Sequence, residues 1–387
     1  MKRPPSYQGW YNVAAVLKGG SLCFHKSPSG SVGLFGTWRF RENAPRAAEP
    51  PNMNEKQLKA LRAMFSGGEP SSAMMVATLS EWYDAKHRRA SPEEVAFINS
   101  LPAESCPYCG STGLRRDGFA KKTGLLIREC KTCGRKFNPL AGTIFDSRKI
   151  PFSEWVEFLL HLFQFHSVRT SAFDNRNADS TGFYWLSKAF LVVDGIQDEI
   201  VLSGDVFIDE TYFPRWKSRA ETKGGRRLRG LSRNQFCVCS ATDGKRCSLV
   251  LCGVGKPSGN KAVKGYSGHI AKGSRIIHDG DNSHDALISL LGLGGEIHPT
   301  SETKGLPDQD NPMEPINEVH RYLSGFIGSH RGFSRDELQG WLNLFCFWWN
   351  TPGDAFQKAQ EFIKLAAKKR TMLRYRDWKK GKNRDGE

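Results

Sequence analysis

Hydrophobic residues change their spacing along the chain, and this change separates helix-like from strand-like regions. Apolar residues three or four positions apart predict helices over 53–100 and 150–200, and from residue 311 to the end. After residue 204 short apolar runs alternate with polar turns and predict strands. These runs are DVFIDETYF, NQFCVCSAT, CSLVLCGVG and SRIIHDG. Strands with helices between and after them predict an α/β domain over about 200–350.

Capping residues mark the candidate helix boundaries before the strands. Ser91 followed by Pro92 is typical of a helix N-terminus. Residues 153–166 form a strongly apolar helix pattern, after which Ser167 and Thr181 are candidate caps of two further helices. This outline fits a helix-turn-helix that reads the major groove of DNA. It fits a plain helical linker equally well.

Residues 1–52 differ from the rest of the chain. They are rich in glycine, proline and serine and show no sustained periodicity, whereas a helical pattern begins at Met53. The segment is either a disordered basic arm or an extension upstream of the true start at Met53.

The chain carries a strong positive charge. The formal net charge of the 387 residues is +16, which indicates a polyanion such as DNA or RNA as a partner. The charge is clustered: 215–233 carries eight lysines and arginines against one acid, and 364–384 is similarly basic. No stretch approaches the roughly 18 apolar residues of a membrane span. With no apolar leader after Met1, we expect a cytoplasmic protein without a membrane partner.

Four of the ten cysteines form two C-x-x-C pairs, Cys106 with Cys109 and Cys130 with Cys133. Each pair is followed by glycine, which suits the tight turn that points two sulfurs at one ion. Four thiolates at this spacing predict one structural Zn²⁺, with no coordination position left open for catalysis. The basic residues between the pairs alternate like a hairpin, and nucleic acid is the expected contact. The cysteines at 237, 239, 247 and 252 lie in apolar runs and are interpreted as buried hydrophobic residues.

Two carboxylates end apolar strand-like runs. Asp209 lies within FIDETYF, and Asp279 follows RIIH and precedes a glycine. A carboxylate in a buried strand is costly unless a cation or another partner compensates it, and two such carboxylates in one sheet could hold Mg²⁺ through oxygen ligands. The alternatives are a solvent-facing acid on an edge strand for Asp209 and an ordinary turn residue for Asp279.

A third metal ligand is expected on the helix after residue 311. Glu314, Asn317 and Glu318 are all candidates by residue type. An ordinary amphipathic helix with outward polar residues is the alternative.

Taken together and in this order, the blocks resemble the zinc-ribbon DDE transposases of bacterial insertion sequences. The resemblance runs from about Cys106 to Asn350 and rests on four blocks: the cysteine pairs through CKTCGRKFNPLAGTIF, then GDVFIDETYF, then GSRIIHDGD, then PINEVHRYLSGFIGSHRGFSRDELQGWLNLFCFWWN.

The resemblance implies a ribonuclease-H-like fold and Mg²⁺- or Mn²⁺-dependent cleavage and strand transfer at the ends of a DNA element. It implies Asp209 and Asp279 as the first two ligands and Asn317 as the third, where many relatives carry glutamate; Glu318 and Glu314 remain alternatives. Relatives carry a lysine where this chain has Ser324. The implied partners are double-stranded DNA, both terminal inverted repeats and target, and a second copy of the chain on DNA, in the nucleoid.

Asn317 and Ser324 keep a second function open, that of a transposase-derived DNA-binding protein without catalysis. A third possibility is a metal-dependent nuclease without strand transfer. The expected fold is a ribonuclease-H-like mixed sheet with flanking helices, preceded by a zinc ribbon and a helical segment that is either a helix-turn-helix or a linker. The expected segments are the extension at 1–52, helices at 53–103, the ribbon at 104–146, the helical segment at 147–200, the catalytic domain at 201–352 and a basic tail at 353–387.

Overall fold

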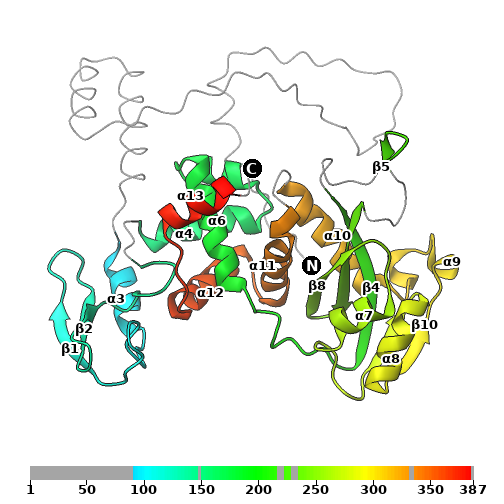
Figure 1. The fold of residues 1–387 in the computed structure, drawn as a ribbon, viewed down its shortest axis with the longest axis horizontal. Coiled ribbons are helices and arrows are strands. Elements are labelled where there is room, and N and C mark those ends of the chain that lie inside the picture. Colours follow the sequence, from blue (N-terminus) through cyan, green and yellow to red (C-terminus); the bar gives the residue numbers. More distant parts are fainter. Residues whose placement is uncertain (1–89, 147–149, 216–221, 228–233, 331–334, 385–387) are drawn as a thin grey trace, which may run out of the picture. The chain divides into compact units, whose positions relative to one another are not determined.

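The computed structural model of the chain describes residues 90–146, 150–215, 222–227, 234–330 and 335–384 (Figure 1). The predicted extension at 1–52, the helices expected over 53–89 and most of the basic cluster at 215–233 lie outside the described residues. None of the helices in the described part of the chain has the length and apolar character needed to cross a membrane.

The first described elements are a helix and a small antiparallel sheet. Helix α3 (Pro92–Ser100) begins as predicted at Ser91, whose hydroxyl accepts a hydrogen bond of 3.2 Å from the Glu94 amide. The small sheet has three strands in the order β1-β2-β3. They are β1 (Leu114–Phe119), β2 (Leu126–Cys130) and β3 (Lys136–Phe137). The basic hairpin expected between the cysteine pairs is therefore present as β1 and β2.

Three helices follow, and one boundary differs from the prediction. They are α4 (Phe152–Phe163), α5 (Val168–Asp174) and α6 (Asp179–Val193). Ser167 caps α5 as predicted, because its hydroxyl accepts a hydrogen bond from the Thr170 amide. The prediction that Thr181 caps the next helix is wrong: the N-cap of α6 is Ala178, three residues earlier, and the helix begins at Asp179. The helix starts earlier because Thr181 and Gly182 already donate backbone hydrogen bonds to the Ala178 carbonyl.

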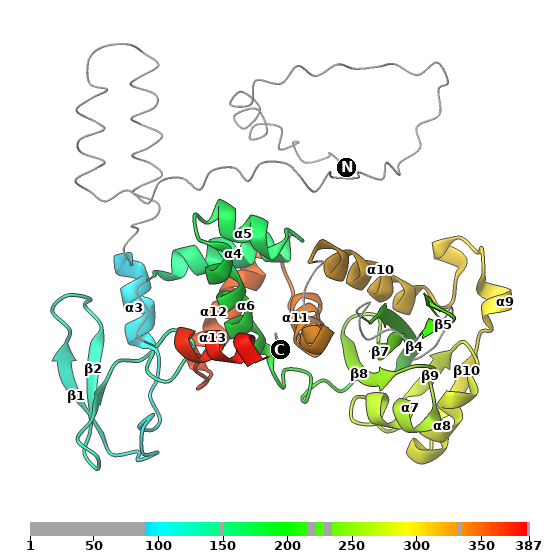
Figure 2. The same ribbon diagram turned by 45° about the horizontal axis from the view of Figure 1, so that its top comes forward.

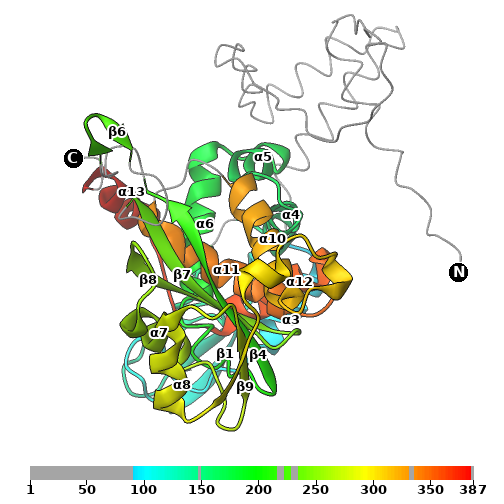
Figure 3. The same ribbon diagram turned by 90° about the vertical axis from the view of Figure 1, so that its right-hand side faces the viewer.

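A mixed five-stranded sheet is the centre of the second half of the chain (Figure 3). Its order is β10-β9-β4-β7-β8; β4 pairs antiparallel with β7 and parallel with β9, β7 pairs antiparallel with β8, and β9 pairs parallel with β10. The strands are β4 (Asp205–Pro214), β7 (Gln235–Thr242), β8 (Cys247–Val254), β9 (Arg275–His278) and β10 (Gly294–Ile297). This order and these directions are those of the ribonuclease-H-like fold, which confirms the predicted fold class. A two-stranded hairpin, β5 (Thr222–Lys223) with β6 (Arg226–Arg227), lies between β4 and β7 in the sequence.

Helices cover both faces of this sheet (Figure 2). One face packs Val206 and Ile208 of β4 against Ala262 and Tyr266 of α7 (Gly259–Tyr266) and against α8 (Asp285–Leu291). The other face lies under α10 (Glu314–Ser329), where Ile316 packs with Phe207 and Ile277. Because side chains alternate along a strand, even positions of β4 face α7 and odd positions face α10.

The edge strand β8 is protected by side chains from α11 and from the turn that follows α6. Helix α11 (Leu338–Asn350) packs along it, and Asn350 accepts from the Cys247 amide at 2.7 Å and donates to the Cys247 carbonyl at 2.9 Å. Gln197 makes the same pair of bonds with Leu249, at 2.7 and 2.9 Å. These bonds satisfy backbone groups that an open sheet edge would leave free.

The remaining helices, α12 (Ala355–Lys368) and α13 (Tyr375–Arg384), close the chain. The Tyr184 hydroxyl of α6 donates to the Leu373 carbonyl at 2.6 Å, and Trp378 of α13 donates to the Ser187 hydroxyl at 2.8 Å. The basic tail is thus anchored to α6. Two short helices, α9 (Thr300–Thr303) and the 3-10 turn at Asp308–Asp310, connect β10 to α10.

Candidate active site

Asp209 lies within β4, and Asp279 directly follows the neighbouring strand β9. Strand β4 pairs in parallel with β9, with Asp205 opposite Arg275 and Phe207 opposite Ile277. This pairing ends at Phe207 and Ile277, and Asp279 directly follows β9 in the turn after His278. The charge of Asp279 contributes to the raised pKa of Asp209, so the two carboxylates lie near each other. Neighbouring strands lie about 4.8 Å apart. The topology therefore brings two carboxylates together that are far apart in the sequence.

Local hydrogen bonds orient both carboxylates. Asp209 Oδ1 accepts from the Glu210 amide at 2.8 Å, and Asp279 Oδ1 accepts from the Asp281 amide at 3.0 Å. The turn after Asp279 requires glycine, because Gly280 has φ +88° and a Cβ there would lie 2.8 Å from Ile297 Cγ2. Glycine at this position lets the chain turn sharply and leaves the Asp279 carboxylate at the end of the strand.

The site carries an excess of negative charge that a cation would relieve. Burial, followed by the charges of Asp279 and Glu210, raises the pKa of Asp209 from its ordinary 3.8 to about 7. A divalent cation bound by oxygen ligands would compensate both the burial and the repulsion. The chemistry and the crowding of the two carboxylates therefore fit a Mg²⁺ or Mn²⁺ site.

We expect Asp209→Asn to stabilise the chain in a chelator above neutral pH. Because the folded-state pKa of Asp209 lies above its unfolded value, the folded chain loses stability as pH rises from about 4 to about 7. A shift of three units corresponds to roughly 4 kcal/mol. The Asp209 side chain is 31% exposed, so solvent screening reduces the expected gain to about 1–2 kcal/mol. Urea unfolding of the parent chain and of Asp209→Asn, near pH 5 and near pH 8, measures the difference in their free energy of unfolding.

Glu302→Gln is the control for this measurement, since Glu302 is exposed on α9. Its effect on the free energy of unfolding should be small at both pH values. Equal stability of the parent and Asp209→Asn at the higher pH would contradict the expected repulsion. Addition of Mg²⁺ should stabilise the parent and leave Asp209→Asn little changed.

Helix α10 presents its candidate ligands in different directions. His320 marks the side that faces the site, because its Nδ1 lies 3.7 Å from Asp209 Oδ2. At 100° per residue, Asn317 is about 60° around the helix from His320, Glu314 about 120° and Glu318 about 160°. Asn317 is half-buried and Glu318 is exposed. The helix therefore turns Asn317 toward the carboxylates more than either glutamate.

The two glutamates have other surroundings. Glu314 Oε1 lies 2.6 Å from Arg321 Nη2 on the same helix. Glu318 lines a separate pocket together with Tyr322, Trp348 and Lys358. Neither environment is that of a carboxylate directed at Asp209.

His320 is a site residue that the sequence reasoning missed. Burial lowers its pKa to about 4, so the imidazole is neutral at physiological pH. Its Nε2 is buried and has no hydrogen-bond partner among the described residues. A neutral imidazole beside Asp209 can accept a proton or bind a cation. The sequence could have indicated His320 as a site residue, because it lies three residues after Asn317 and on the same side of the helix as Ile316.

A buried polar network, also missed, lies on the α7 face of the sheet and reaches Asp279, since one ligand atom each of His278, Asp279 and His284 lie within 4.8 Å of one another. The Tyr266 hydroxyl lies 3.0 Å from Glu210 Oε1 and 3.1 Å from the Asp209 carbonyl oxygen. His284 Nε2 lies 3.2 Å from the same Glu210 oxygen, and its Nδ1 lies 3.0 Å from His278 Nδ1. Burial lowers the pKa of His284, but its hydrogen bond to Glu210 and the Glu210 charge outweigh this and raise it overall.

The network joins the two strands that carry the aspartates. His278 Nδ1 also accepts a hydrogen bond of 3.2 Å from the Gly280 amide, next to Asp279. The chain of contacts from Tyr266 to Gly280 therefore connects the Asp209 strand to the Asp279 turn. The signal in the sequence was Glu210, a second acid directly after Asp209 in a strand that is otherwise apolar.

The four paired cysteines come together at one point of the small sheet. One sulfur from each lies within 4.8 Å of the others; the Cys106–Cys133 sulfurs are 3.7 Å apart and the Cys109–Cys130 sulfurs 3.5 Å. Tetrahedral Zn²⁺ with bonds of about 2.3 Å separates its sulfurs by about 3.8 Å. The glycines after each pair have φ +74° and +68°, as the predicted turns require. The cysteines at 237, 239, 247 and 252 are buried, as expected.

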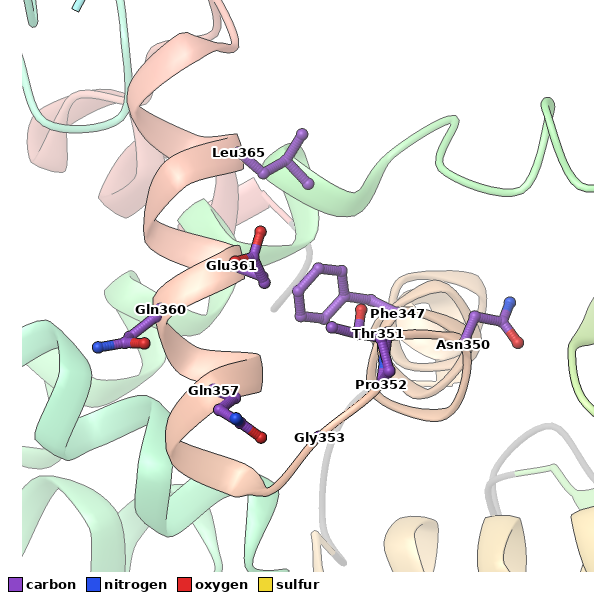
Figure 4. A pocket seen from close by; sticks show the side chains of 9 residues that line it. All are labelled: Phe347, Asn350, Thr351, Pro352, Gly353, Gln357, Gln360, Glu361 and Leu365. Atoms are coloured by element: carbon purple, nitrogen blue, oxygen red, sulfur yellow. The ribbon is translucent and has the colours of Figure 1, made fainter.

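A surface pocket between α11 and α12 lies apart from these sites (Figure 4). Its one acid, Glu361, pairs with Lys364 at 2.7 Å. The lining residues are Phe347, Asn350, Thr351, Pro352, Gly353, Gln357, Gln360, Glu361 and Leu365. None of the sequence-predicted site residues lines it.

Comparisons with known proteins find structural similarity to transposases at low identity. The catalytic domain of the Mos1 mariner transposase is 12% identical with a TM-score of 0.26, over 49% of this chain and 95% of that one. The Mos1 strand transfer complex is 12% identical with a TM-score of 0.25, over 52% of this chain and 73% of that one. The Mos1 paired-end complex with Mn is 14% identical with a TM-score of 0.23, over 52% and 72%. No family model and no curated protein matches the chain. Similarity at this level carries no argument about what the chain binds or cleaves.

Proposed function

We propose that this chain is a DDE-type transposase, in which the third position is Asn317, and that it cuts and joins DNA at the ends of a mobile element. The observation that carries the proposal is that Asp209 on β4 and Asp279, directly after the neighbouring parallel strand β9, come close enough for repulsion to contribute to the raised pKa of Asp209. The net charge of +16 supports DNA as the partner.

In this proposal Asp209, Asp279 and Asn317 hold Mg²⁺ or Mn²⁺ through oxygen atoms. Bound divalent ions activate the attacking oxygen and stabilise the leaving oxygen of a phosphodiester. His320 lies 3.7 Å from Asp209 and restricts its carboxylate on the side of α10. The Glu210 and His284 contacts hold the strand from behind. Glu318 and Glu314 are the alternatives at the third position.

The cysteine cluster serves DNA binding in this proposal. Cys106, Cys109, Cys130 and Cys133 bind one structural Zn²⁺, which stabilises the hairpin of β1 and β2. Arg115 and Arg116 are exposed on β1, and they are suited to contact phosphates. A second copy of the chain is expected on paired DNA ends.

One other function, a DNA-binding protein without catalysis, has specific features in its favour. An asparagine at position 317 supplies no charge to a metal site, which favours a DNA-binding protein without catalysis. Ser324 stands where relatives of the resembled family carry lysine, and this favours weakened DNA contact at the helix.

The deciding experiment incubates the full chain with duplex DNA carrying the sequence that flanks its reading frame, with Mg²⁺ or Mn²⁺ and a target plasmid. A transposase gives cleavage at the element end followed by joined product. Cleavage without joining identifies a nuclease. Binding with no metal-dependent cleavage identifies the non-catalytic protein, and it would overturn the proposal.

DNA affinity should fall steeply as salt rises. Each phosphate neutralised by a lysine or arginine releases counterions, so log affinity should fall linearly with log salt at about −0.9 per phosphate contact. Fluorescence anisotropy over a salt series measures the slope. Arg115→Ala should make the slope shallower by about one unit, whereas Glu302→Gln serves as a surface control. An affinity independent of salt would contradict the electrostatic interpretation.

A further inference from the structure

The corner between α4 and α5 gathers two histidines and an aspartate away from both sites described above. His161 lies in the last turn of α4, His166 follows in the loop, and Asp174 is the last residue of α5. One ligand atom from each lies within 4.8 Å of the others. The two imidazole rings are stacked, with centroids 5.3 Å apart and planes 17° apart. The three side chains converge on one point.

The distances in this cluster are those of a coordination sphere more than of a hydrogen-bonded group. Asp174 Oδ2 lies 3.8 Å from His161 Nδ1 and 4.0 Å from His166 Nδ1. Both exceed the 2.7–3.2 Å range of a hydrogen bond to nitrogen. Ligand atoms around a tetrahedral Zn²⁺, with bonds of about 2.0–2.1 Å, lie about 3.3–3.4 Å apart. The two nitrogen–oxygen distances would each have to shorten by about 0.4–0.7 Å to reach this value.

The state of His161 agrees with this interpretation. Its Nδ1 is buried and lacks a hydrogen-bond partner among the described residues. The side chains of His166 and Asp174 are 43% and 38% exposed, so an ion can enter from solvent.

The backbone between the two histidines is bent in a way that brings them together. Phe165 has φ +66°, a left-handed conformation that bulky residues rarely adopt. With this bend, the His166 amide donates to the His161 carbonyl at 3.0 Å and the two rings stack. The Phe165 ring packs against Phe326 and Trp348 at centroid distances of 5.3 and 5.1 Å. Tertiary packing therefore holds the bend, and uncommon backbone of this kind is concentrated at functional sites.

We propose that His161, His166 and Asp174 bind a transition-metal ion of the zinc type, which fixes the angle between α4 and α5. Two imidazoles and one carboxylate suit Zn²⁺ and its neighbours better than Mg²⁺. Three protein ligands leave a fourth position for water. Glu157, one turn before His161, adds negative charge near the site. The site is separate from the thiolate cluster and the aspartate pair, and it does not depend on the proposed function.

Metal stoichiometry of the full chain tests this site. With excess Mg²⁺ present to occupy the aspartate pair, the parent should bind two zinc ions tightly. His166→Ala and Asp174→Ala should each bind one ion, with affinity for the other reduced about 100-fold or more. His298→Ala is the matched control, a half-buried histidine paired with Glu296 outside the cluster. Cys130→Ser should lose the ribbon ion and keep the one proposed here.

Cobalt spectra distinguish the two zinc sites. Cobalt in a thiolate site shows sulfur-to-metal charge-transfer absorption, whereas cobalt bound by imidazole and carboxylate shows only weaker ligand-field bands. His166→Ala should remove the ligand-field bands of the imidazole–carboxylate site and leave the charge-transfer absorption of the thiolate site unchanged. His166→Gln, with circular dichroism as a folding check, guards against misfolding of the alanine variant. One zinc ion per parent chain, or two ions that survive both His166→Ala and Asp174→Ala, would overturn the proposal and leave a stacked histidine pair beside an aspartate.

Discussion

Asp209→Asn and Asp279→Asn should each reduce metal-dependent DNA cleavage by several orders of magnitude while leaving DNA affinity within about twofold. Each asparagine keeps the size of the side chain and removes the charge that the cation requires. The basic hairpin and the tail that we expect to bind DNA lie on other elements. Cleavage of a labelled duplex and anisotropy on the same duplex measure the two effects separately.

Variants in helix α10 test which of its residues is the third metal ligand. If the Asn317 amide oxygen is a ligand, Asn317→Ala should lower activity and Asn317→Asp should retain it. Glu318→Ala should keep activity, since Glu318 is exposed and about 160° around the helix from His320. An inactive Glu318→Ala with an active Asn317→Ala would show that the helix register is wrong by one residue. An inactive Glu314→Ala alone would move the ligand a turn earlier.

Cys130→Ser should remove the zinc ion of the small sheet and unfold that region. Cys130 is fully buried, and its sulfur lies 3.5 Å from that of Cys109. Structural zinc supplies much of the folding free energy of a small ribbon, and this sheet has only three short strands. Zinc content by mass spectrometry and proteolysis between residues 104 and 146 measure the two losses.

Cys252→Ser is the control for this variant. Cys252 is also buried, but it lies on β8 and outside the cluster of four sulfurs. Its replacement should leave the ribbon zinc in place whatever it does to the large sheet. Retention of the ribbon zinc in Cys130→Ser would contradict the assignment of the four cysteines.

Local patterns in the sequence were sufficient to predict the main strands of the large sheet and the cluster of four cysteines. Strand β4 was predicted because DVFIDETYF is apolar and bounded by turns, and a strand depends largely on such a run. The paired cysteines were predicted because coordination of one ion requires close spacing within each pair. Asp209 and Asp279 were recognised as candidates for the same reason, since each interrupts or ends an apolar run.

Sequence patterns did not predict elements that are very short or that depend on contacts with distant parts of the chain. Strand β10 has only four residues, GGEI, and it forms by pairing in parallel with β9. Helix α6 begins before the predicted Thr181, although Ala178 provides no side-chain cap. The predicted segment boundaries remain predictions, as do the roles of the site residues.

Residue types and their spacing are enough to identify the reactive groups of this protein: paired thiols, carboxylates in or after apolar strands, and an excess of basic charge. Which of these groups lie close together depends on the tertiary structure. The parallel pairing of β4 with β9 brings Asp209 near the turn that carries Asp279. The rotation of α10 turns His320 toward Asp209 while Glu318 points elsewhere. The approach of Asp174 to His161 likewise depends on how α5 folds back on α4. These outcomes depend on packing between residues distant in the chain, and no periodicity within a short segment encodes such distances.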